Sequence, residues 1–86
     1  MTDQRMEGVR TDAVARASML RVANAWQALG QVNQALDTYL RILARYPDSA
    51  EAREAGERIR VQAEVYERRG QLHLALGLYD KLEARP

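Results

Sequence analysis

Few side chains in this chain of 86 residues have the chemistry of a catalyst or a metal ligand. There is no cysteine, which excludes disulfide bonds, thiolate metal ligands and thiol nucleophiles. The single histidine, His73, falls on the polar side of a predicted helix, with Asp80 as its nearest acidic candidate. It has neither a second metal ligand nor a nucleophile to activate. We therefore expect a surface histidine, with no metal, no cofactor and no catalytic residue.

The remaining candidates are scattered rather than grouped. Asp37 and Asp80 are predicted to face solvent on separate helices, and no pair of carboxylates is spaced for acid–base work. The glycines occur singly and form no phosphate-binding loop. Trp26 and the tyrosines stand at positions where packing explains them better than a ligand cage does. The sequence therefore predicts a protein that is not an enzyme.

Composition narrows the class of partner. The chain has 13 basic and 12 acidic residues, mixed along its length, and a formal net charge of +1. That balance predicts no binding of nucleic acid or of an anionic membrane. The hydrophobic content of 47% is sufficient for the core of one small domain. Residues 1–10 are polar and lack the apolar stretch of a signal peptide, so we expect a cytoplasmic location.

A repeat organises the chain. Gly30-Gln31 recurs as Gly70-Gln71, and the same offset of 40 residues relates Ala35-Leu36 to Ala75-Leu76, Tyr39 to Tyr79 and Trp26 to Tyr66. Self-similarity at a fixed period of this size is the signature of a repeat architecture. Each copy is expected to be one helical hairpin that turns at its glycine, because glycine adopts the left-handed conformation that ends a helix.

Helical periodicity places four helices. The first is expected from a cap at Thr11 or Asp12 to about Leu29, the second at 32–45, the third from a cap at Asp48 or Ser49 to about Arg69, and the fourth at 72–84. Residues 1–10 are predicted to be a flexible arm or a weak helical extension, residues 11–49 the first repeat, and residues 50–86 the second. The alternating leucines of 72–78 would suit a strand, but the repeat assigns them to a helix.

These residues resemble a tetratricopeptide repeat. Along Arg16 to Ser49, the bulky, small, aromatic, turn and proline positions of that family are filled by Met19, Val22, Ala23, Trp26, Gly30, Ala35, Tyr39, Ile42 and Pro47. A second copy fits 56–86, with Gln62 where a large apolar residue is usual and six extra residues at 50–55. The resemblance implies an all-α fold of antiparallel helical hairpins stacked as a short right-handed superhelix.

The resemblance also implies a function in protein–protein interaction, as a small adaptor or assembly factor. Its binding surface is the concave face of the first helices, to which six residues map: Leu20, Asn24, Gln27, Arg60, Glu64 and Glu67. Asn24 matches a position that clamps peptide carboxylates in chaperone-binding members of the family. The lysine expected one turn earlier is Leu20, so the clamp is incomplete and we do not predict binding of chaperone tails.

The last helix has an unusually wide apolar arc, because Leu74 and Leu78 replace Gln34 and Thr38 of the second helix. A helix apolar over more than half its circumference is normally buried on both sides. One hypothesis is that Leu74, Leu78 and Leu82 form the interface of a two-fold homodimer, and the chain would then be a self-associating structural subunit. The alternative is that these leucines cover the third helix of their own chain.

Overall fold

The fold consists of helices joined by short turns. The computed structural model describes the backbone of residues 4–84 and the side chains of residues 11–84. The four helices in this range are α1 (Gln4–Ala28), α2 (Val32–Arg45), α3 (Ala50–Arg68) and α4 (Leu72–Glu83). The expected all-α class is thus confirmed, and the leucine-rich segment is helical rather than extended. Gly56 does not interrupt α3.

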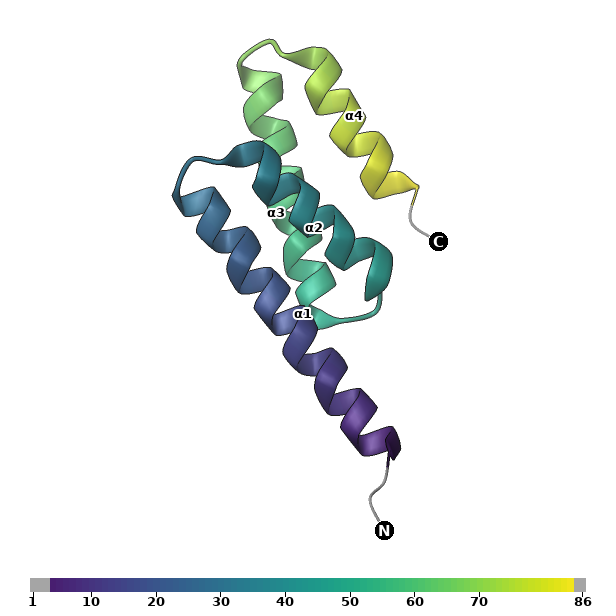
Figure 1. Ribbon diagram of the computed structural model, residues 1–86. Coiled ribbons are helices and arrows are strands. Elements are labelled where there is room, and N and C mark those ends of the chain that lie inside the picture. Colours follow the sequence, from purple (N-terminus) through teal and green to yellow (C-terminus); the bar gives the residue numbers. More distant parts are fainter. Residues whose placement is uncertain (1–3, 85–86) are drawn as a thin grey trace.

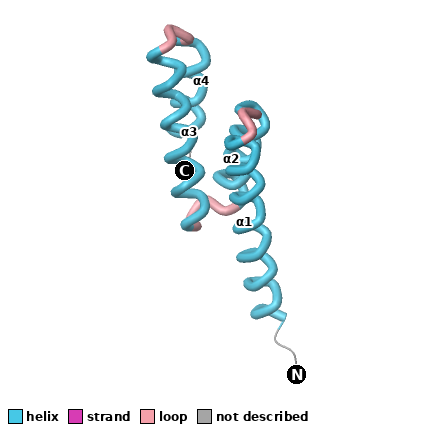
Figure 2. The backbone as a smooth tube through the Cα atoms, turned by 90° about the vertical axis from the view of Figure 1, so that its left-hand side faces the viewer, coloured by secondary structure: helices cyan, strands magenta, loops and turns pink. Residues whose placement is uncertain are grey.

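The helices form two antiparallel hairpins, α1 with α2 and α3 with α4 (Figure 1). The hairpins lie side by side, and the N-terminal part of α1 projects beyond both (Figure 2). Helix α3 packs on α2 and also touches α1, whereas α4 contacts only α3 among the described helices. This is the stacked arrangement that the repeat predicts.

Both hairpins turn in the same way. Gly30 and Gly70 have φ of 77° and 75°, which only glycine adopts without strain. The amide of Gln31 donates to the Trp26 carbonyl at 2.9 Å, and the amide of Gln71 donates to the Tyr66 carbonyl at 2.8 Å. These bonds satisfy carbonyls that the helix end would leave unpaired. The repeat of 40 residues is therefore preserved in the hydrogen bonds.

The core is built from large side chains of three helices and from alanines between them. Tyr39, Ile42 and Ile59 are its largest fully buried side chains. Five alanines are completely buried and let the helices approach closely: Ala23, Ala35, Ala52, Ala55 and Ala63. Ala23 of α1 is one of them, as expected for a small residue at a helix crossing. At the start of α3, Ser49 accepts a hydrogen bond from the Ala52 amide at 3.0 Å, which confirms it as the cap.

Three details differ from the predictions. Helix α1 begins at Gln4, so the expected start at Thr11 or Asp12 is wrong; no proline interrupts this segment, and a formed helix extends at little cost. Residues 1–3 of the expected arm lie outside the described residues. Val22, which fills a bulky position of the repeat, is 49% exposed, because no helix within residues 4–84 packs on that side of α1. Gln62 is only 8% exposed.

Candidate functional site

The α1 side of the candidate surface is organised around Asn24. The Tyr39 hydroxyl of α2 donates to Asn24 Oδ1 at 2.6 Å, and Asn24 Nδ2 donates to Glu54 Oε2 of α3 at 3.3 Å. One side chain thus connects three helices. Leu20 and Gln27 lie one turn to either side of Asn24 and are half-buried. Because both ends of the Asn24 amide are engaged, this asparagine holds the surface together.

The electrostatics of the site keep the Tyr39 hydroxyl protonated. Burial raises the pKa of Tyr39 above its ordinary value of 10.0, the Arg58 charge opposes this shift, and the Glu54 charge adds to it. A neutral phenol is the form that can donate to Asn24. Near neutral pH the hydrogen bond from α2 to α1 is therefore fully formed.

On α3 the candidate residues form a charged row. Arg60 is hydrogen-bonded to Glu57 and, at 3.1 Å, to Glu64. The hydrogen bond to Glu57, followed by the charges of both glutamates, raises the pKa of Arg60. Arg60 thus forms ion pairs with Glu57, one turn before it, and with Glu64, one turn after it.

Glu67 continues this row toward α4. Its carboxylate accepts a hydrogen bond from the Tyr79 hydroxyl at 2.8 Å, and that bond is the main reason why the pKa of Tyr79 is raised. A surface hollow lies here, lined by Glu64, Glu67, Arg68 and Tyr79. The second repeat thus directs its tyrosine to an exposed glutamate, where the first repeat directs the equivalent Tyr39 to Asn24.

We call the surface formed by these residues the α1–α3 face: Leu20, Asn24, Gln27, Glu54, Glu57, Arg60, Glu64 and Glu67. Six of them are the predicted site residues, which lie on α1 and α3 in groups of three. Sequence reasoning missed Glu54 and Glu57. Glu54 falls within the six extra residues at 50–55, to which the repeat pattern assigns no role. Its spacing of three residues from Glu57, on the same side of α3, is the signal that could have found it.

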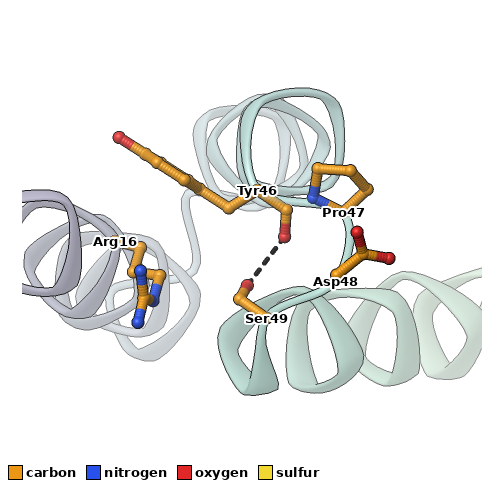
Figure 3. A pocket seen from close by; sticks show the side chains of 5 residues that line it. All are labelled: Arg16, Tyr46, Pro47, Asp48 and Ser49. Atoms are coloured by element: carbon orange, nitrogen blue, oxygen red, sulfur yellow. Dashed lines mark hydrogen bonds between the residues drawn. The ribbon is translucent and has the colours of Figure 1, made fainter. Parts of the chain in front are cut away.

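A second hollow lies where the hairpins meet (Figure 3). It is lined by Arg16, Tyr46, Pro47, Asp48 and Ser49. Arg16 Nε is 3.0 Å from Glu51 Oε1, which ties α1 to the first turn of α3. The Ser49 hydroxyl donates to the Tyr46 carbonyl at 2.7 Å while it caps α3. Since Arg16 and Ser49 are bonded within the chain, this hollow is part of the joint between the hairpins.

The three leucines predicted as an oligomer interface have different environments. Leu78 is 7% exposed within the core, and Leu82 packs against that core. Both therefore follow the alternative prediction, in which α4 covers its own chain. Leu74 is 51% exposed and could still contact another molecule. His73 is exposed, as expected for a surface histidine.

Among the side chains of residues 11–84, no three His, Asp or Glu residues are grouped as metal ligands would be. None of the helices in residues 4–84 is both long enough and apolar enough to cross a membrane.

The sequence of the first hairpin matches a known family of helical repeats. The family model for the tetratricopeptide repeat matches residues 17–49, from α1 through α2 to the cap of α3. Residues 17–49, which make up most of the first hairpin, therefore match a tetratricopeptide repeat. Its second hairpin has the same turn geometry at the 40-residue spacing, so the four described helices correspond to about two repeats. No significant match was found among curated proteins or among solved structures.

The match to this family implies a general function. Tetratricopeptide repeats bind other proteins, and this chain is a protein–protein interaction module in that general sense. The pattern behind the match lies in buried and turn positions such as Ala23, Gly30 and Tyr39. Those positions maintain the hairpin and do not determine which partner it binds.

Proposed function

We propose that the chain is a small, non-catalytic adaptor or assembly factor that binds a protein segment on its α1–α3 face. The observation that carries this proposal is the hydrogen bond from Asn24 of α1 to Glu54 of α3. It joins the exposed sides of the two first helices into one surface. A segment that lies across this surface can contact both repeats at once.

The chemistry of the face supports a partner recognised by its pattern of charges. Arg60 lies between two carboxylates, those of Glu57 and Glu64, and Leu20 adds an apolar side chain on α1. Rearranging these exposed ion pairs costs little, since pairs in water contribute at most about 1 kcal/mol each. The face can therefore exchange internal ion pairs for pairs with a partner. The incomplete carboxylate clamp argues against chaperone tails as that partner.

Selection from a library of displayed random peptides, followed by calorimetric titration, tests the proposal. Arg60→Glu reverses a charge in the centre of the α3 row. Arg41→Glu is the matched control, because Arg41 is 70% exposed on α2 and faces Asp37 at 4.0 Å in the same i,i+4 arrangement. We expect R60E to weaken binding by about tenfold or more, and R41E to leave it unchanged. Equal effects of the two variants would place the binding surface elsewhere.

A second candidate function is that of a self-associating structural subunit, as a homodimer or larger homo-oligomer. It is supported by three leucines of α4, Leu72, Leu74 and Leu76, which are 62%, 51% and 59% exposed. Exposed apolar side chains grouped on one helix are typical of an interaction surface. Because Leu78 belongs to the core, a test of an α4 interface should change Leu74 alone; Leu74→Gln should reduce the solution mass if Leu74 is in the interface.

The expectations about location and other partners remain part of the proposal. We propose a cytoplasmic protein that binds neither nucleic acid nor membranes. A fluorescent fusion and cell fractionation test the location. A DNA-binding assay at low salt tests the charge argument, because electrostatic binding is strongest there.

A further inference from the structure

Residues related by the offset of 40 differ in exposure between the two hairpins. The differences identify which side chains of α2 are covered by α3. Leu36 of α2 is 8% exposed, whereas the equivalent Leu76 of α4 is 59% exposed. Ala35 and Ala75 are 0% and 2% exposed. Helix α2 contacts both α1 and α3, while α4 has only α3 beside it in the described chain. The alanines are therefore covered within each hairpin, and Leu36 is covered by the hairpin that follows.

Comparing α3 with α1 in the same way identifies the residues of α3 that pack on α2. The contact between α2 and α3 is called the junction below. Gln62 of α3 is 8% exposed, and the equivalent Val22 of α1 is 49% exposed. Ile59 is fully buried, while the equivalent Met19 is only partly buried. Helix α3 has a hairpin before it and α1 has none among the described residues. The side of α3 that contains Ile59 and Gln62 is thus the side that fits α2.

At positions shifted by 40 residues, the two halves of the junction correspond to surfaces of α4 and α1 that no helix within residues 4–84 covers. We define the C-terminal face as Leu72, Leu76 and Tyr79, and the N-terminal face as Ala15, Met19 and Val22. The C-terminal face contains a surface hollow lined by Glu67, Leu72, Ala75, Leu76 and Tyr79. It corresponds to the α2 side that α3 occupies within the chain.

We propose that a second copy of this chain docks head to tail, its N-terminal face on the C-terminal face of the first. The contact repeats the buried junction between α2 and α3, with α4 in place of α2 and the neighbouring α1 in place of α3. Side-chain sizes are kept at the equivalent positions: Leu76 stands for Leu36, Tyr79 for Tyr39, Met19 for Ile59 and Val22 for Gln62.

A second copy in this orientation explains both open ends. A two-fold contact between α4 helices would cover Leu76 and leave Val22 exposed. In the head-to-tail contact each face covers the other. Leu74 lies outside this contact, because its equivalent, Gln34, is exposed at the internal junction. The proposed interface therefore differs from the pairing of Leu74, Leu78 and Leu82 expected from the sequence.

At one edge, the proposed contact between copies has charged residues where the junction within the chain has buried apolar ones. Leu43 and Ala52, which are buried, correspond to Glu83 and Asp12, which are exposed. These two acids weaken the contact, and added salt should strengthen it by screening their charges. Because a head-to-tail contact uses two different surfaces, it does not close by itself. The mass should grow with concentration without stopping at a dimer.

Two variants that each block one face test the proposal by light scattering coupled to size exclusion. Leu76→Lys blocks the C-terminal face and Val22→Lys blocks the N-terminal face. Both positions are about half exposed, at 59% and 49%, so each hairpin should fold, which circular dichroism checks. Each substitution should weaken self-association by at least about tenfold, since burial of one such side chain contributes more than that factor.

The mass of a mixture of the two variants distinguishes the head-to-tail contact from other contacts. Each variant alone should be a monomer of 9.8 kDa, and an equimolar mixture should show twice that mass, because one open face of each kind remains. Leu74→Lys is the matched control and should assemble like the wild type. A wild type that stays monomeric up to its solubility limit overturns the proposal. Assembly of V22K at the wild-type level also overturns it and favours a two-fold contact through α4.

Discussion

The two tyrosines at equivalent positions of the repeats predict opposite outcomes of the same substitution. Tyr39 is 0% exposed, and its hydroxyl donates to Asn24 Oδ1 at 2.6 Å. Tyr39→Phe removes that hydrogen bond without changing the packing of the ring. The loss should lower the free energy of unfolding by about 1 kcal/mol, which is the usual net contribution of such a bond. For a domain of this size the melting temperature should fall by about 4–8 °C.

Tyr79→Phe is the matched control. The Tyr79 hydroxyl donates to an exposed carboxylate, that of Glu67, at 2.8 Å, and water can replace it there. Its loss should change the free energy of unfolding much less than the loss of the buried Tyr39 hydroxyl does. Urea unfolding followed by circular dichroism measures both variants under the same conditions. Equal losses in Y39F and Y79F would refute the assignment of a special role to the hydrogen bond between Tyr39 and Asn24.

The same tyrosine predicts how stability depends on pH. Burial raises the pKa of Tyr39 in the folded chain above the 10.0 expected for the unfolded chain. The folded state therefore holds the phenolic proton more tightly. This contribution to stability is complete below pH 10 and is lost as the pH rises through the folded pKa. Y39F should show a shallower loss of stability above pH 10 than the wild type, and parallel curves would contradict the argument.

Five further substitutions test the fold. Ile59→Ala should lower the free energy of unfolding by about 2–5 kcal/mol, because Ile59 is fully buried. Val61→Ala, at a site 47% exposed, should lower it far less. Similar losses in urea unfolding would contradict the assignment of Ile59 to the core. Ser49→Ala should cost about 1 kcal/mol through loss of the α3 cap, and a neutral result would argue against it. Gly30→Ala should destabilise by about 1–2 kcal/mol at a φ of 77°, whereas Gly77→Ala, in open space within α4, should stabilise by up to about 1 kcal/mol. Thermal melts that moved in the same direction for both glycines would contradict the assigned turn.

The hairpins could be predicted from the sequence because their determinants are local and repeated. Gly30 and Gly70 mark turns that few other residues allow, and alanines at the helix crossings mark close approaches. Such positions have one main physical explanation each. The start of α1 at Gln4 was left open between a flexible arm and a helical extension, because this polar segment has no apolar stripe that would favour the helix.

The environment of each surface residue was harder to predict, since it depends on which neighbour is present. Leu78 could cover α3 or meet another molecule, and only the packing of α4 decides that it lies in the core. Glu54 of α3 accepts a hydrogen bond from Asn24 of α1, and the two residues are 30 positions apart in the sequence. Gln62 is buried at the junction of the hairpins, where an apolar residue was expected. Periodicity within one helix contains no information about such contacts between hairpins.

Binding on the α1–α3 face is the central claim, and amide chemical-shift mapping with a selected peptide tests it most directly. The account predicts that the largest shifts fall on both first helices, around Leu20, Asn24 and Gln27 of α1 and around Glu54, Arg60 and Glu64 of α3. Shifts confined to Val22, Leu72 and Leu76 would instead show that the peptide occupies the open ends of the stack. That result would contradict the assignment of the α1–α3 face as the binding surface.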